Sequence, residues 1–213
     1  MVITGIALVH FLFSDARADY TAVKTANRLF EAGKLAEAAE NYRNITETEP
    51  DSPNSLVAAF NLGNTLFHAN RYAEAAVHFR EFAAKPAVSE RFRADARFNA
   101  GNALARLAMN SDNRRQKNRL LKAALTEYRM ALLINPDDDE NKINHEIISR
   151  LLDELSSPPF SGKSSVSNAG RSGAENDIVS NILEQTAMEE QSVLRNRYRS
   201  SSRTKQPGSN KDW

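Results

Sequence analysis

The amino-acid sequence predicts an all-α fold in which helical hairpins stack side by side into a solenoid. Two observations lead to this prediction. Segments of similar sequence recur along the first two thirds of the chain, and within them apolar residues follow the three-to-four-residue spacing of an amphipathic helix. Proline and glycine separate these segments, as expected where helices begin and end.

Three segments share small, bulky and aromatic residues at fixed offsets. In the first helix of a hairpin, a small residue precedes a leucine by three positions; in the second helix, a small residue precedes an aromatic residue by four. The first-helix pairs are Ala26 and Leu29, Gly63 and Leu66, and Gly101 and Leu104, and the second-helix pairs are Ala38 and Tyr42, Ala75 and Phe79, and Ala124 and Tyr128. A small residue lets two helix backbones cross closely, and the ring fills the space between hairpins.

This pattern resembles that of tetratricopeptide repeats (TPRs), which are helix–turn–helix units of about 34 residues. The resemblance implies about three repeats in residues 19–155. The spacing is longer here, with 37 positions from Ala26 to Gly63 and 38 from Gly63 to Gly101. The additional residues are expected in the turns between repeats. A polar, basic insertion at 110–119 predicts either a projecting surface loop or a longer helix.

The segment after Pro136 predicts a helix that caps the solenoid. The acidic run 137–140 suits a helix N-terminus, where the helix dipole favours negative charge. Seven helices are therefore expected over about residues 20–155. The apolar face that covers the last hairpin is expected to contain Ile143, Ile147, Leu151, Leu152 and Leu155.

Both ends of the chain differ from the repeats. Residues 1–18 combine an apolar run with Ala16 and Ala18 at an A-x-A-like cleavage site, which predicts a secretory signal peptide and a periplasmic protein. No Lys or Arg precedes the run, so a buried N-terminal helix is the alternative. Residues 156–176 are rich in Ser, Gly and Pro and predict a flexible linker. A helix is expected at 177–199 and a disordered tail at 200–213.

Asparagines recur in the first helices, which in solenoids of this class line the concave groove. Because a side-chain amide both donates and accepts hydrogen bonds, asparagines flanked by phenylalanines predict capture of an extended peptide. The expected partner-binding residues are Asn27, Phe30, Phe60, Asn61, Asn64, Phe67, Phe98, Asn99 and Asn102. The alternative is that some asparagines bond between neighbouring helices and only build the solenoid.

Some proteins of this repeat class hold a partner's C-terminal carboxylate with a lysine one helical turn before the asparagine. Val23, Phe60 and Phe98 occupy that position here. A carboxylate clamp of that kind is therefore not expected.

Three further motifs lie between residue 99 and Trp213. They are the stretch NAGNAL at 99–104, the sequence NPDD at 135–138 followed by Lys142, and a terminal Lys211-Asp212-Trp213 after a glutamate-rich segment. Their order resembles that of the TPR proteins of bacterial Bat (aerotolerance) operons. The resemblance implies a scaffold on the periplasmic side of the membrane, linked to oxidative stress or envelope integrity. It also implies membrane-anchored von Willebrand factor A-type proteins as partners, with Lys211, Asp212 and Trp213 docking on one of them.

The composition argues against catalysis. The chain has no cysteine, no glycine-rich phosphate loop and no histidine pair at helical spacing, so we expect no metal, no cofactor and no enzyme activity. The net charge of +1 gives no reason to expect nucleic acid as the main partner, and membrane association is expected to be indirect. Two alternatives remain: a general peptide- or chaperone-type binding module, and membrane-surface or nucleic-acid binding through the basic segment 193–211.

Overall fold

The structure is a computed structural model that describes residues 21–48, 50, 52–156, 173–175, 177–186, 188 and 192. All regular secondary structure in these residues is helical, which confirms the all-α prediction. The chain divides into two compact units, Met1–Gly170 and Arg171–Trp213. The predicted signal peptide, almost all of the predicted linker, and the tail with Lys211, Asp212 and Trp213 lie outside the described residues.

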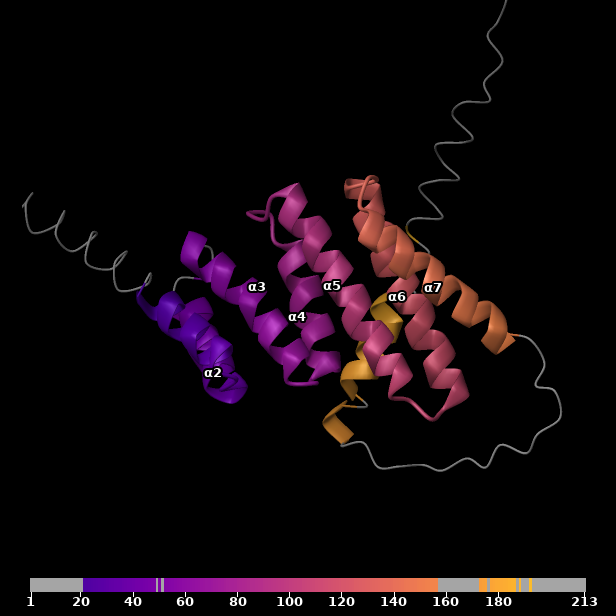
Figure 1. Ribbon diagram of the computed structural model, residues 1–213, viewed down its shortest axis with the longest axis horizontal. Coiled ribbons are helices and arrows are strands. Elements are labelled where there is room, and N and C mark those ends of the chain that lie inside the picture. The colour runs from indigo at the N-terminus through magenta and orange to yellow at the C-terminus, as the bar shows by residue number, and fades with distance from the viewer. Residues whose placement is uncertain are drawn as a thin grey trace, which may run out of the picture. The chain divides into compact units, whose positions relative to one another are not determined.

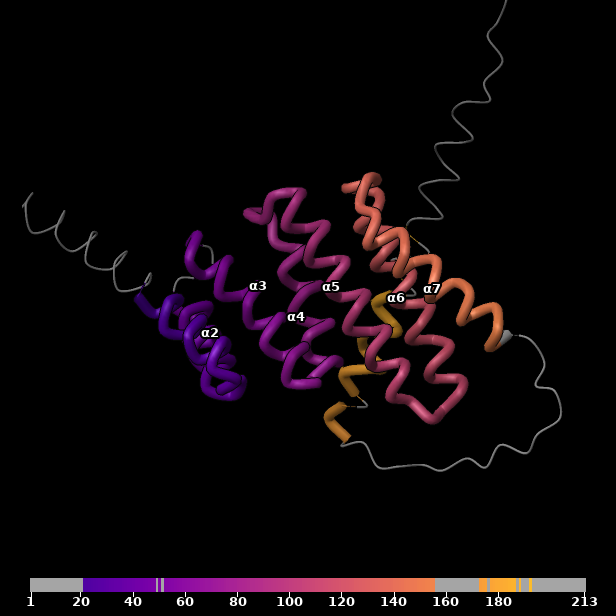
Figure 2. Tube along the Cα trace, in the orientation of Figure 1, coloured from indigo at the N-terminus to yellow at the C-terminus, as the bar shows by residue number. Residues whose placement is uncertain are grey.

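The first unit is a row of helices that pack in chain order (Figures 1 and 2). Residues 21–31 are helical, and α2 (Leu35–Thr48), α3 (Pro53–His68), α4 (Tyr72–Ala84), α5 (Glu90–Met109), α6 (Arg114–Ile134) and α7 (Asp139–Ser156) follow. From α2 to α7, each helix packs against the helix that follows it, and α3 also touches α5. Seven helices are thus found in the described residues up to 156, as predicted.

Local sequence explains where several helices begin and end. Ser52 accepts a hydrogen bond from the Ser55 amide at 3.1 Å and caps α3, whose first residue is Pro53. Gly33 has a φ of +72° in the turn before α2, a conformation that glycine adopts without steric cost. Asn70 has a φ of 59° in the turn between α3 and α4.

The polar insertion at 110–119 is divided between a short turn and a longer helix. Helix α5 ends at Met109, and α6 already begins at Arg114, where Asn113 accepts a hydrogen bond from the Gln116 amide at 3.0 Å. Ser111 in the turn is buried. Most of the insertion therefore lengthens α6 instead of projecting as a loop.

The hairpins close around two glycines. A Cβ atom built on Gly63 would lie 2.7 Å from the Phe79 ring, and one built on Gly101 would lie 2.5 Å from the Tyr128 ring. Both rings are buried, so neither can move aside without disturbing its neighbours. The glycines of α3 and α5 therefore admit the aromatic residues of α4 and α6.

A buried charge cluster joins three consecutive helices. Glu127 of α6 is fully buried, and its carboxylate lies 2.9 Å from Arg80 of α4 and 2.8 Å from Arg97 of α5. Both arginine side chains are at most 13% exposed. The Glu127 carboxylate would be costly to bury alone, and its pairing with both arginines links α4, α5 and α6.

Helix α7 packs through a face that agrees only in part with the one predicted: Leu151 and Leu155 are half-buried. Ile148 and Leu152 are buried, whereas Ile143 and Ile147 are 58% and 54% exposed, so the prediction for these two isoleucines is wrong. The reason is Asn141, which is fully buried and donates its side-chain amide to the Tyr128 carbonyl oxygen at 3.2 Å. That polar anchor rotates the helix and turns the two isoleucines outward.

The second unit contains a helix at residues 177–186, in which Val179 and Ile182 are buried. Residues 188 and 192 are helical as well, in agreement with the helix expected at 177–199 as far as it is described. Residues 173–175 are also helical, although they belong to the segment predicted as a linker.

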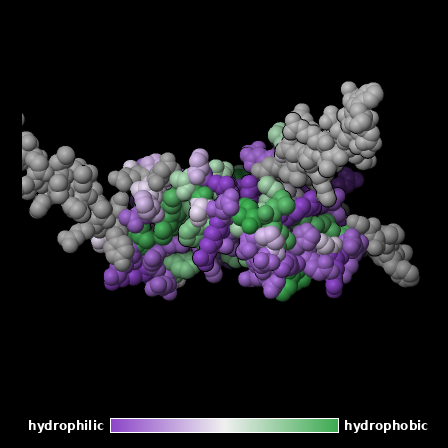
Figure 3. Space-filling view, turned by 90° about the horizontal axis from the view of Figure 1, so that it is seen from above, coloured by the Kyte–Doolittle hydropathy of each residue, from purple (hydrophilic) through white to green (hydrophobic). Residues whose placement is uncertain are grey.

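On the face shown in Figure 3, hydrophilic residues surround smaller hydrophobic areas. No helix among the described residues combines the length and apolar character that a membrane span requires.

We predict that Gly101→Val lowers the free energy of unfolding by about 1–3 kcal/mol, because the added side chain must displace the buried Tyr128 ring. Urea unfolding followed by circular dichroism would measure the change. The control is Ala105→Val, one turn later on the same helix and half-buried, which should cost less than about 1 kcal/mol of helix propensity. Equal losses in the two variants would contradict the role assigned to Gly101.

Candidate functional site

Six half-buried asparagines form pairs between successive helices, and we call them the asparagine ladder. Each pair joins the second asparagine's amide nitrogen to the first one's carbonyl oxygen. The pairs are Asn27 with Asn61 at 3.3 Å, Asn64 with Asn99 at 3.5 Å, and Asn102 with Asn144 at 3.0 Å. The ladder therefore runs from the first helix through α3 and α5 to α7.

Two buried tyrosines hold the ladder at its ends. The Tyr42 hydroxyl donates to the Asn27 carbonyl oxygen at 2.5 Å, and the Tyr128 hydroxyl donates to that of Asn102 at 2.9 Å. Burial raises the pKa of both phenols, so they remain protonated and act as donors. In the middle hairpin the equivalent position is occupied by Phe79, which has no hydroxyl to donate. The amide hydrogen bond there, between Asn99 and Asn64, is the longest of the three.

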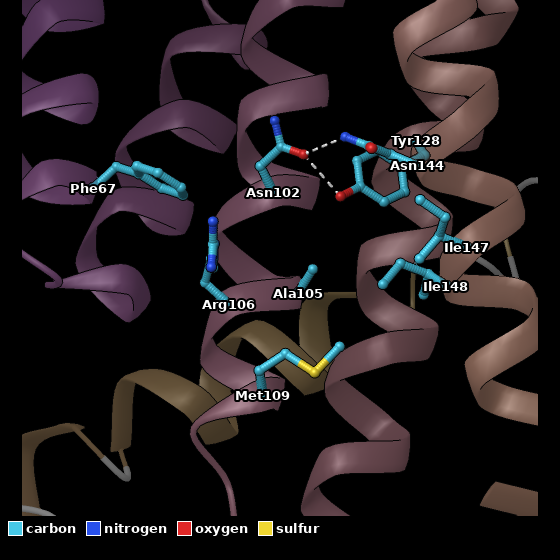
Figure 4. A pocket seen from close by; sticks show the side chains of 9 residues that line it. All are labelled: Phe67, Asn102, Ala105, Arg106, Met109, Tyr128, Asn144, Ile147 and Ile148. Atoms are coloured by element: carbon cyan, nitrogen blue, oxygen red, sulfur yellow. Dashed lines mark hydrogen bonds between the residues drawn. The ribbon is translucent and has the colours of Figure 1, made fainter. Parts of the chain in front are cut away.

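These bonds orient the side-chain amides of Asn27 and Asn102. Each carbonyl oxygen accepts two hydrogen bonds, so the amide nitrogen must point the other way. In Figure 4 the Asn102 nitrogen points away from Tyr128 and Asn144. The amide nitrogens of Asn27 and Asn102 donate no hydrogen bond to any described residue. Two oriented donors are thus available to an acceptor outside the fold.

Two recesses open along the ladder. The first recess has a volume of about 200 Å³ and is lined by Asn27, Phe30, Glu31, Tyr42, Asn61 and Asn64. The second recess, drawn in Figure 4, has a volume of about 400 Å³ and is bounded by α5, α6 and α7, with Phe67 contributed by α3.

The second recess combines an apolar wall with a single charge. Side chains from α5 and α7 form most of it, and Arg106 is its only charged residue among those described. The side chains from these two helices are Asn102, Ala105, Arg106, Met109, Asn144, Ile147 and Ile148. Met109 and Ile147 are 47% and 54% exposed, which is unusual for large apolar residues that face one another across a recess.

The structure separates the four predicted phenylalanines into two groups. Phe30 lines the first recess and Phe67 the second. Phe60 instead packs edge-on against Phe79 and Phe82, with ring centroids 5.7 and 5.4 Å apart.

Phe98 packs against the ring of Tyr128, with centroids 5.9 Å apart, and lines neither recess. Phe60 and Phe98 each directly precede an asparagine of the ladder, and adjacent helical residues point about 100° apart. Those two rings therefore serve the packing between helices.

All five predicted asparagines belong to the ladder, and the first and second recesses are lined by four of them. Asn99 pairs with Asn64 and lines neither recess.

Sequence reasoning missed Asn144, Arg106, Met109 and Glu31. Asn144 could have been found by extending the asparagine spacing into the capping helix, where it follows Asn102 by 42 positions.

The comparisons with known proteins add nothing to this geometry: no family model matches the chain, and no curated protein sequence matches it. Within the part of the chain that the structure describes, no group of three or more His, Asp or Glu side chains is placed to hold a metal ion. What the site can do chemically is to offer amide donors and apolar surface to an extended ligand.

We predict that Tyr128→Phe lowers the free energy of unfolding by about 0.5–1.5 kcal/mol near pH 7, because the Asn102 oxygen loses one of two donors. The matched control is Tyr72→Phe, which removes a phenol outside the ladder whose partner, Asn70, is exposed and can bond to water instead. Urea unfolding of both variants would compare the losses, and an effect no larger than that of the control would contradict the role of Tyr128.

The same variant should also change the response to alkaline pH. Because burial raises the folded-state pKa of Tyr128, the unfolded chain releases this proton first, and the native protein loses stability as the pH rises above the unfolded value of 10.0. Tyr128→Phe should lose less stability between pH 9 and about pH 11.

Proposed function

We propose that this protein is a non-enzymatic TPR scaffold whose helix-lined groove captures an extended segment of a partner protein. The observation that carries the proposal is the orientation of the Asn27 and Asn102 amides, which present unused donors beside the two recesses. The TPR assignment is supported by the small residues Ala26, Gly63 and Gly101 at matching positions and by the packing of helices in chain order.

An extended peptide fits these groups better than a compact ligand. Its backbone carbonyl oxygens recur at regular intervals and accept hydrogen bonds without regard to side-chain identity. Its side chains alternate outward, and an apolar one can enter the second recess against Met109 and Ile147. The contact is small compared with a permanent interface, so the expected complex is reversible.

A narrower proposal concerns the setting of the protein. The motifs at 99–104, 135–138 and 211–213 favour a Bat-type envelope complex, in which the partner is a membrane-anchored von Willebrand factor A-type protein. In that setting the groove and the terminal Lys211-Asp212-Trp213 are two separate contact points. Linking two weak contacts on one chain raises the overall affinity without any new interaction.

The capture proposal is tested with Asn102→Asp. Aspartate keeps an oxygen that accepts from Tyr128 and Asn144, so the ladder and the fold should persist. It replaces the free donor with a second acceptor, which repels a peptide carbonyl oxygen. We expect native protein to enrich binders from a displayed library of random peptides about 12 residues long. Asn102→Asp should bind the enriched peptides at least about tenfold more weakly.

Asn54→Asp is the matched control, because Asn54 lies in the first turn of α3 and lines neither recess. It should bind the enriched peptides like the native protein, and thermal unfolding should show that both variants are folded. Failure of native protein to enrich any peptide would overturn the capture proposal. Equal binding by Asn102→Asp would show that its amide nitrogen is not the binding group.

The narrower proposal is tested by a crosslinked pull-down from native membranes with the full-length protein and with a variant that lacks Lys211, Asp212 and Trp213. We expect the full-length protein to recover a von Willebrand factor A-type membrane protein and the truncated variant to lose it. Recovery of the same protein by both forms would assign binding to the groove alone. Recovery of no membrane protein by either form would overturn the Bat-type setting.

A further inference from the structure

The two recesses carry charges of opposite sign. Glu31 is the charged residue of the first recess, and Arg106 is that of the second. Both side chains are exposed, and neither forms an ion pair or a hydrogen bond with any other described residue. By contrast, Arg150 and Glu146 of α7 form an ion pair at 2.7 Å.

Arg106 lies beside the most apolar part of the groove. Met109 follows it on α5, and Ile147 faces them from α7 in Figure 4. Met109 is 47% exposed and Ile147 54%. An apolar side chain of the ligand would remove part of this exposed surface from water. An acidic residue next to that side chain would reach the Arg106 guanidinium, which pairs well with a carboxylate.

We infer that the groove selects partner segments in which an apolar residue stands beside an acidic residue at one end and a basic residue stands at the other. The apolar and acidic residues occupy the second recess, and the basic residue pairs with Glu31 at the first. This inference rests on the proposed peptide capture and adds the charge pattern that the captured segment must carry.

One ligand chain can span both recesses because each has a lining residue on α3. Asn64 lines the first recess and Phe67 lines the second, and these residues are three positions apart in one helix. Three residues correspond to about 4.5 Å along the helix axis, less than two residues of extended peptide. The amide nitrogens of Asn27 and Asn102 lie on either side of this junction, where backbone carbonyl oxygens of the same ligand would pass.

The charge pattern also argues against a nucleic acid in the groove. A phosphate backbone presents negative charge along its whole length, and the exposed Glu31 would repel it. A peptide can place opposite charges at its two ends, so that a basic residue pairs with Glu31 and an acidic residue pairs with Arg106.

The test is charge reversal followed by repeated selection from the same peptide library. Peptides enriched by native protein should carry Asp or Glu beside an apolar residue and Lys or Arg toward the other end. Arg106→Glu should weaken their binding about tenfold, and Glu31→Arg should do the same. The double variant Glu31→Arg/Arg106→Glu should select peptides in which the acidic and basic positions are exchanged.

Lys122→Glu is the control for a general change in charge, because Lys122 is exposed on α6 and lines neither recess. It should leave the selected pattern unchanged. If native protein enriches peptides that lack the charge pattern, or if the double variant does not exchange it, this inference is overturned while peptide capture stands. If native protein enriches no peptides, peptide capture itself fails.

Discussion

The structure depends on the close approach of two helices inside each hairpin. Gly63 and Gly101 leave room for the rings of Phe79 and Tyr128, which would otherwise collide with a Cβ atom at 2.7 and 2.5 Å. Once the rings are buried at these crossings, the first helix of each hairpin has a defined axial position and a defined rotation relative to the second helix. The five asparagines that the sequence singles out are carried by those first helices, so the crossings also set their positions in the site.

The asparagine ladder links this packing to the two recesses. The Tyr128 ring that fills the crossing also carries the hydroxyl that bonds to Asn102, so one side chain serves the core and the site together. The oxygen side of the Asn102 amide holds successive helices together, and its nitrogen side points away from these bonds. In Asn27 and Asn102, the structural role and the proposed binding role, which sequence reasoning treats as alternatives, therefore belong to opposite ends of one amide group.

Buried polar groups fix the packing of the helices that bound the second recess. Glu127 with Arg80 and Arg97 holds α4, α5 and α6 in register, and Asn141 anchors α7 on the backbone of α6. Such groups are costly to bury in any arrangement that leaves them unpaired, so they favour one packing over its neighbours. The rotation of α7 that follows places Ile147 in the apolar wall of the second recess.

The sequence by itself determined the seven helices between residues 21 and 156, their pairing and five of the six asparagines of the ladder, because helical periodicity and small-residue crossings are local signals. It also singled out Phe30 and Phe67. Only the tertiary structure decided that Phe60 and Phe98 pack between helices, that Ile143 and Ile147 face outward, and that Glu31 and Arg106 lie at the two recesses. The physical reason is that periodicity identifies the apolar side of a helix but not its rotation, which is set by bonds such as that of Asn141 to a neighbouring helix far along the chain.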